Sequence, residues 1–228
     1  MKKILITIAY TLTIQLVYCD TYQHMQEIFT KTYESNWWGD NESVSGTGSN
    51  LKQTELIRLN LPSLLKLLQV KTFLDAACGD FYWMKEIDLS FLDMYIGVDI
   101  VPNLIKRNRE RYMHNNRSFK LLNIAFDPLP KADLIFCRDC LVHLEFADCI
   151  KVLKNFKKSG AKYLLISTFT RNQPNAELSE TGWRTLNMQK PPFNFPQPFM
   201  MLNEDCSEGE GAYHDKSLGL WRLDDINL

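Results

Sequence analysis

Between residues 72 and 170 the chain alternates short apolar runs with stretches of helical character, and this alternation constrains the fold more than any other feature. The apolar runs predict strands over residues 72–76, 94–99, 118–123, 132–137 and 162–170. The intervening segments 81–87, 102–113 and 146–159 predict helices. Strands that alternate with helices are typical of a parallel, doubly wound sheet. Because runs such as 134–137 are apolar throughout, we expect helices on both faces of this sheet.

The region after residue 170 is predicted to close the sheet. Residues 171–198 are rich in Pro, Asn and Gln and predict a long loop over the carboxyl edge of the strands. Residues 199–202 and 217–223 then predict an antiparallel C-terminal strand pair. The fold class is therefore α/β, with a Rossmann-like, mostly parallel sheet. A chain of 228 residues suits one such core.

The region before residue 72 predicts helices and a connecting segment. Residues 21–35 predict a helix, and residues 51–70 have helical periodicity in which Pro62 is expected to start a second helix. Between them, residues 43–50 are small and polar. We expect residues 20–50 to form an N-terminal lid or linker and residues 51–228 to form the domain.

The first nineteen residues have the order of a secretory signal peptide. Lys2 and Lys3 precede an apolar run over residues 4–18, and cleavage is expected after Cys19. The protein would then enter the secretory pathway or be secreted, without a stable membrane span. A buried first strand or helix in a cytoplasmic protein, or an uncleaved membrane anchor, are the alternatives. The remaining five cysteines are an odd number, which disfavours a disulfide framework.

Polar residues follow the predicted strands at the carboxyl edge, where open α/β sheets bind their ligands. They are Asp75 to Phe81, Asp99, Asn123 with Ile124, and Asp139 with His143. Asp99 ends its strand twenty residues after Gly79. That spacing is typical of a carboxylate that binds the hydroxyls of a ribose. The sequence therefore predicts a nucleoside-binding site.

The charge of the first turn distinguishes between two kinds of nucleoside cofactor. A dinucleotide needs a turn with three glycines for its pyrophosphate, whereas Gly79 is the one glycine here and Asp75 and Asp80 would repel a diphosphate. Carboxylates suit the positively charged ammonium and sulfonium groups of S-adenosylmethionine. The total of 26 basic and 27 acidic residues gives no overall field that would attract nucleic acid.

From about Trp37 to the C-terminus the sequence resembles the class I S-adenosylmethionine-dependent methyltransferases. The resemblance rests on residues 45–49, 74–81, 95–101, 137–144, 181–184 and 215–221. Ala77 and Phe81 replace the first and third glycines of the first family motif, and Asn123 replaces a frequent Asp. The resemblance implies residues 51–228 as a methyltransferase domain.

The resemblance also implies a set of cofactor-binding residues. Ala77 and Gly79 would lie against the methionine part, with Asp75 supporting the turn and Asp139 near the methionine amino group. Asp99, followed by Ile100, would accept hydrogen bonds from the ribose. Asn123 and Ile124 would flank the adenine.

Asp139 and His143 are the candidate catalytic residues. A histidine near the reacting methyl group can remove a proton from the acceptor, but His143 can equally pack the helix that follows the fourth strand. No metal site is expected, because Cys137, Cys140 and His143 lack a second pair of ligands at zinc spacing. Trp37, Trp38, Trp183 and Trp221 are expected either to face an apolar or sugar acceptor or to serve as core or lid packing.

The predicted function is methyl transfer from S-adenosylmethionine to an unidentified acceptor, expected to be a small molecule. Arg171, Arg184 and the loop over residues 172–187 are the expected region of acceptor specificity. Two alternatives stay open: a protein of the same fold that binds S-adenosylmethionine without catalysis, which Ala77 and Phe81 would favour, and a nucleotide-dependent oxidoreductase.

Overall fold

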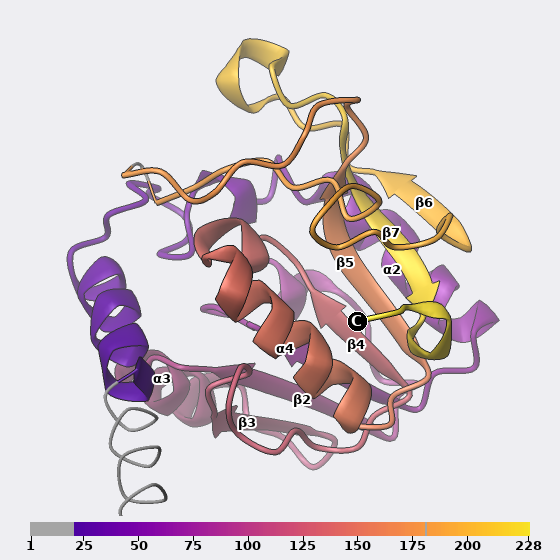
Figure 1. Cartoon of the computed structure of the whole chain (residues 1–228). Coiled ribbons are helices and arrows are strands. Elements are labelled where there is room, and N and C mark those ends of the chain that lie inside the picture. The colour runs from indigo at the N-terminus through magenta and orange to yellow at the C-terminus, as the bar shows by residue number, and fades with distance from the viewer. Residues whose placement is uncertain (1–20, 181) are drawn as a thin grey trace, which may run out of the picture.

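The computed structural model describes residues 21–180 and 182–228, and its centre is a seven-stranded sheet in the order β3-β2-β1-β4-β5-β7-β6 (Figure 1). The first five strands are parallel. β7 is antiparallel to β5, and β6 is antiparallel to β7. The strands are β1 (Thr72–Ala76), β2 (Met94–Asp99), β3 (Arg117–Leu121), β4 (Leu134–Cys137), β5 (Tyr163–Phe169), β6 (Met200–Asn203) and β7 (Lys216–Arg222). The predicted Rossmann-like sheet and its antiparallel C-terminal pair are confirmed.

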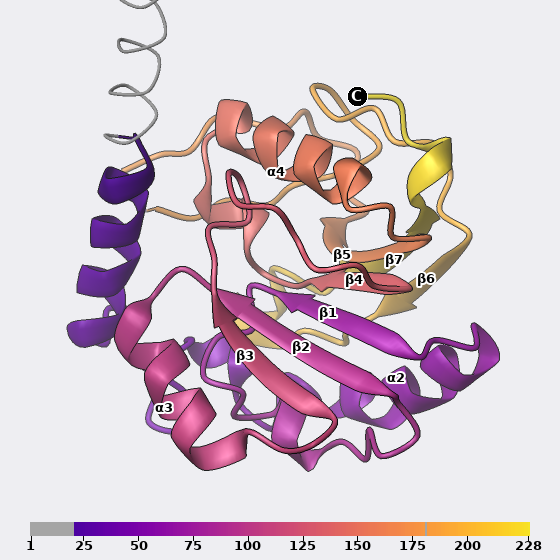
Figure 2. The ribbon, with the colours of Figure 1, turned by 90° about the horizontal axis from the view of Figure 1, so that it is seen from below.

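Helices cover both faces of the sheet, as Figure 2 shows. α4 (Phe146–Lys158) packs on one face, while α2 (Glu55–Leu67) and α3 (Pro102–Tyr112) pack on the other. Successive strand residues point to opposite faces, so Leu74 of β1 packs in the cluster that contains α4 and Phe73 packs in the cluster that contains α2 and α3. The strands are therefore apolar throughout because both of their faces are buried.

The segment after β1 differs from the prediction of a helix over residues 81–87. It contains only a 3-10 turn, Met84–Glu86. Phe81 has a φ of +59°, which a right-handed helix does not allow, and its buried ring packs edge-on against Tyr95 and Phe119. The aromatic packing beneath the turn decides the backbone here.

Pro62 lies inside α2 and does not start a second helix. Its missing N–H removes one hydrogen bond from the helix. The buried residues Ile57, Leu61, Leu64 and Leu65 form one stripe that continues on both sides of Pro62. Burial of that stripe holds the two halves as one helix.

The N-terminal helix, residues 21–34, lies beside α3 and the carboxyl end of β2 (Figures 1 and 2). The Tyr22 hydroxyl donates to Asp127 Oδ2 at 3.0 Å, and Gln26 Nε2 donates to the Ile100 carbonyl at 3.0 Å. The proposed signal peptide and its cleavage after Cys19 fall outside the described residues. Within the described part of the chain, no helix has the length and apolar character needed to span a membrane.

Candidate active site

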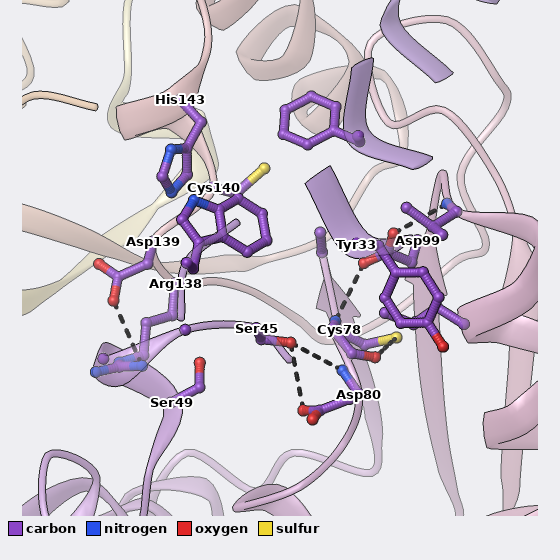
Figure 3. A pocket seen from close by; sticks show the side chains of 18 of the residues that line it. Tyr33, Ser45, Ser49, Cys78, Asp80, Asp99, Arg138, Asp139, Cys140 and His143 are labelled. Atoms are coloured by element: carbon purple, nitrogen blue, oxygen red, sulfur yellow. Dashed lines mark hydrogen bonds and ion pairs between the residues drawn. The ribbon is translucent and has the colours of Figure 1, made fainter. Parts of the chain in front are cut away.

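A cavity of about 400 Å³ opens where β1, β2 and β4 end, a size typical of small-ligand sites (Figure 3). The nine residues predicted to bind the cofactor or to act in catalysis all line the cavity: Asp75, Ala77, Gly79, Asp99, Ile100, Asn123, Ile124, Asp139 and His143. Phe81, which was also expected at this edge, is buried in the core instead. The structure therefore brings the predicted cofactor-binding and catalytic residues together.

The turn after β1 requires glycine at position 79. Gly79 has a φ of +53°, and a Cβ there would lie 2.4 Å from Ser45 Oγ. Its N–H donates to Asp99 Oδ2 at 3.1 Å, while Asp99 Oδ1 accepts from the Val101 N–H at 3.1 Å. The Asp99 carboxylate thus joins the first turn to the start of α3. The spacing of twenty residues between Gly79 and Asp99 serves the fold as well as the site.

Two buried carboxyl groups at this end have raised pKa values. Burial raises the pKa of Asp75 to about 7, although the Tyr95 hydroxyl donates to its Oδ2 at 2.5 Å and lowers the pKa in part. Burial likewise raises the pKa of Asp99 to about 6 against the hydrogen bonds from backbone N–H groups. A cation in the cavity would favour the ionised form of both groups.

Asp80 holds the N-terminal segment over the turn. Its carboxylate accepts hydrogen bonds from Ser43 Oγ at 3.0 Å and from the Val44 N–H at 3.1 Å, and the Asp80 N–H donates to Ser45 Oγ at 3.1 Å. Ser45, Asp80 and Cys78 lie together at the base of Figure 3. Sequence reasoning treated Asp80 only as a negative charge and missed this contact between distant segments.

Asn123 is almost wholly buried at the end of the cavity nearest the N-terminal helix. Its Oδ1 accepts from the Ala125 N–H at 3.0 Å, and its Nδ2 donates to Met25 Sδ at 3.6 Å. An amide oxygen has a second lone pair. Asn123 therefore keeps one acceptor position for a ligand.

Asp139 belongs to a buried network of charged side chains. Lys216 Nζ lies 2.5 Å from Asp139 Oδ2, and Arg138 NH1 lies 3.4 Å from the same oxygen. Arg138 also pairs with Glu204 at 2.8 Å, and Lys216 lies 3.9 Å from Glu208. Burial raises the pKa of Asp139, but Lys216 and Arg138 outweigh burial, so that the pKa falls to about 2. Asp139 is therefore ionised at neutral pH.

His143 projects from the loop after β4 toward Asp139 (Figure 3). Its Nδ1 lies 2.7 Å from the Gly182 carbonyl, and its ring lies 5.1 Å from that of Trp38. A carbonyl only accepts, so the hydrogen bond places the proton on Nδ1 and leaves a lone pair on Nε2. Burial lowers the pKa of His143, which keeps the ring neutral. His143 both packs against Trp38 and lines the cavity.

Several cavity residues were not predicted. Met25, Phe29 and Tyr33 come from one face of the N-terminal helix. Their spacing in the sequence is typical of one face of a helix, and this pattern could have identified them. Glu208 and Lys216 come from the segment around β7, and no local pattern distinguishes them.

The four tryptophans for which the sequence suggested a role divide between the two predicted roles. Trp38 and Trp183 line the cavity, Trp221 is buried in the core, and Trp37 is 72% exposed. Neither arginine of the expected specificity loop lines the cavity. The Arg171 side chain pairs with Asp215. The Arg184 guanidinium donates to the Val142 and Leu144 carbonyls, on either side of His143.

The composition of the cavity wall fits a cationic nucleoside. Its carboxylates are Asp75, Asp80, Asp99, Asp139 and Glu208, against two basic side chains, Arg138 and Lys216, which are both paired. Gly48 approaches the charged network so closely that a Cβ would lie 3.2 Å from Asp139 Oδ2. Backbone therefore approaches the ligand space closely at Gly48, while carboxylates and aromatic side chains form much of the remaining wall.

A family model described as a methyltransferase domain matches residues 50–222. Among solved structures, the N-methyltransferase NodS from Bradyrhizobium japonicum, in complex with S-adenosyl-L-homocysteine, superimposes with a TM-score of 0.60 at 18% identity, covering 84% of this chain and 97% of that chain. The methyltransferase domain of bacterial CtHen1 gives a TM-score of 0.55 at 13% identity, covering 76% and 100%.

A third similar structure is human N-acetylserotonin methyltransferase in complex with S-adenosylmethionine. Its TM-score is 0.51 at 16% identity, covering 75% of this chain and 55% of that chain. No curated protein that was searched matches the sequence. At these identities the structural likenesses establish the fold.

Proposed function

This chain belongs to the methyltransferase-domain family, and we propose that it transfers the methyl group of S-adenosylmethionine to a small-molecule acceptor. The observation that carries the proposal is the hydrogen bond from the Gly79 N–H to Asp99, which sets a carboxylate beside the first turn in a cavity whose wall holds five carboxylates and two paired basic side chains. A sulfonium and an ammonium group are stabilised there, whereas a diphosphate is repelled.

The residues that would hold the cofactor follow from the wall of the cavity. Asp99 would accept from the ribose hydroxyls, Asn123 and Ile124 would flank the adenine, and Asp139 would attract the ammonium group. Ala77 and Gly79 leave room for the methionine part. When bound, S-adenosylmethionine supplies a methyl carbon made electrophilic by its sulfonium.

His143 would act on the acceptor. Its Nε2 carries a lone pair because Nδ1 donates to the Gly182 carbonyl, and the residue lines the cavity. A neutral imidazole in that position removes a proton from the acceptor during transfer, an effect worth roughly 10²–10⁴ in rate. Asp139, held ionised by Lys216, would contribute by positioning.

We propose that residues 21–50, the described part of the predicted N-terminal lid or linker, form a lid over this site. Asp80 binds Ser43 and Val44, and Met25 contacts Asn123, so the segment touches both the turn and the proposed adenine end. Opening this segment would admit the cofactor.

Calorimetric titration of the full chain tests the function. We expect S-adenosylmethionine and S-adenosylhomocysteine to bind and NAD not to bind. Asp99→Asn is expected to weaken the affinity at least tenfold, whereas Asp93→Asn, at the exposed opposite end of β2, leaves it unchanged. Folded protein that binds neither compound at high concentration would overturn the proposal.

Transfer itself is tested with S-adenosylmethionine carrying a labelled methyl group. Incubation with fractionated lysate is expected to label one small-molecule fraction. A folded protein that binds the cofactor but labels no small molecule would contradict the proposed catalysis.

A further inference from the structure

One end of the cavity has aromatic walls drawn from four separate segments. We call Trp38, His143, Trp183 and Tyr213 the aromatic chamber. Figure 3 places His143 with Cys140 on one side of the cavity, and Asp99 with Tyr33 on the other. The aromatic chamber therefore lies away from the proposed ribose end, where the acceptor is expected.

The rings of the aromatic chamber are held by one another. Trp183 and Tyr213 pack edge-on, with centroids 4.9 Å apart, and Phe169 packs edge-on behind them at 6.1 Å from Trp183. Trp38 packs at 5.1 Å against His143. Trp38, Trp183 and Tyr213 are each only half-buried. The rings thus present fixed apolar surface to the cavity, and such surface favours a flat apolar ligand.

Charge restricts the ligand further. Among the described residues of the cavity wall, the two permanent cations are Arg138 and Lys216, with 4% and 5% of their side chains exposed. Arg138 is paired with Glu204, and Lys216 with Asp139. An anionic acceptor would lose its hydration without gaining an unpaired cation. The acceptor is therefore not a carboxylate or a phosphate.

The proton acceptor at this end is a weak base. His143 presents a neutral Nε2, and burial lowers its pKa from the ordinary 6.5. A phenolic O–H has a pKa of about 10, within reach of such a base, whereas a hydroxyl as weak as water, at about 15.7, is far less acidic.

From these observations, and resting on the proposed function, we propose that the acceptor is an uncharged, planar aromatic molecule with an O–H or N–H group directed at His143 Nε2. The acceptor oxygen or nitrogen forms a bond to the methyl carbon as the carbon–sulfur bond breaks. The electron pair of that bond stays on sulfur, and the acceptor proton passes to Nε2. A cationic sulfonium and a neutral imidazole become a neutral thioether and an imidazolium.

The test compares three probes of similar size on full-length protein loaded with S-adenosylhomocysteine. They are 2-naphthol, 6-hydroxy-2-naphthoate and decahydro-2-naphthol, which differ in charge or aromaticity. We expect 2-naphthol to bind at least tenfold more tightly than the other two, and to accept a labelled methyl group when S-adenosylmethionine replaces the product. The proposed acceptor class would be overturned if either analogue bound as tightly as 2-naphthol or if 2-naphthol did not bind. It would also be overturned if 2-naphthol bound without accepting the methyl group.

Adjacent tryptophans provide a matched control. Trp38→Leu is expected to weaken 2-naphthol binding about tenfold, and Trp38→Phe to retain most of it. Trp37→Leu, which changes an exposed ring outside the cavity, is expected to have no effect. If Trp38→Leu fails to fold, Tyr213→Leu makes the same comparison; unchanged binding in the folded variant contradicts the proposal.

Calorimetry with S-adenosylmethionine distinguishes a failure of the proposed function from a failure of the proposed acceptor class. Absence of cofactor binding would overturn the proposed function itself. Cofactor binding together with any of the contrary probe results would overturn only the aromatic acceptor.

Discussion

The two ends of the cavity are built in different ways. At the proposed cofactor end, the key contact joins Gly79, in the turn after β1, to Asp99, which ends the neighbouring strand β2 twenty residues later. At the end nearest His143, where the proposed methionine part meets the acceptor, Asp139 meets Lys216 across 77 residues, and Thr47 meets Glu208 across 161. The first arrangement is fixed by the single crossover from β1 to β2, whereas the second requires the whole sheet. Local motifs therefore describe the cofactor end and say little about the acceptor end.

The largest effect is expected from His143→Gln at the acceptor end. Glutamine is not a proton acceptor at neutral pH, so the rate of methyl transfer should fall roughly 100- to 10,000-fold. Calorimetry should show an unchanged affinity for S-adenosylmethionine. The exposed His114→Gln is the control. A rate within threefold of wild type would assign His143 to packing alone.

Lys216→Met tests the buried charge network of the same end. The change removes one of the cations that neutralise Asp139 and Glu204. The side chain of Lys216 is only 5% exposed, so the loss falls in a buried site. Breaking a buried pair in this way costs about 3–5 kcal/mol, measurable by urea unfolding. Lys120→Met, on an exposed position of β3, should change the free energy of unfolding by less than about 0.5 kcal/mol. If both variants lost a similarly small amount of unfolding free energy, the buried charge network would add little to stability.

Gly79→Ala tests the cofactor end. The positive φ costs about 1–2 kcal/mol, and overlap of the new Cβ with Ser45 Oγ costs roughly 1–3 kcal/mol more. Gly160→Ala isolates the first cost, because Gly160 has a φ of +72° and no atom within 4 Å of its Cβ position. Urea unfolding of both variants, and of Gly79→Ala combined with Ser45→Ala, separates strain from overlap. Equal losses in the two single variants would rule out the close approach.

The smallest expected effect is the pH dependence of cofactor affinity. With a pKa of about 6, Asp99 is mostly protonated at pH 5, so the affinity for S-adenosylmethionine should be about tenfold weaker there than at pH 8. Calorimetry at both pH values measures this change, and Asp99→Asn should flatten it. An affinity that rises on acidification would contradict the assignment.

The stability of the ligand-free protein should change with pH in the direction opposite to that of the cofactor affinity. The pKa of Asp99 in the folded protein lies above its ordinary value of 3.8. Its contribution to stability is therefore fully present below pH 3.8 and is lost as the pH rises through about 6.

Much of the sheet could be predicted because its signals are local. β1 and β2 have the predicted bounds, and the other strands differ at their ends by a few residues. The predicted helix over residues 81–87 was wrong because Phe81 is drawn into the aromatic cluster below the turn. Pro62 was misread because a continuous buried stripe outweighs the loss of one hydrogen bond.

Part of the candidate site could likewise be predicted from local signals in the sequence, and part could not. Every residue predicted to bind the cofactor or to act in catalysis lines the cavity, since each lies at or just after the end of a strand in a parallel sheet and such strands end at one edge. The arginines expected to face the acceptor do not line it. Arg184 is buried against the carbonyls around His143, and only the folded loop shows this.

The sequence by itself determined the doubly wound sheet, the glycine turn and the carboxylate twenty residues later, because side-chain period and motif spacing act over short stretches of chain. The tertiary structure alone decided that Lys216 meets Asp139. β7 runs antiparallel to β5 and pairs Lys216 with Phe169, the last residue of β5. The first residue of β7 therefore reaches the edge where the parallel strands end. That placement depends on strand direction, which no spacing in the sequence records.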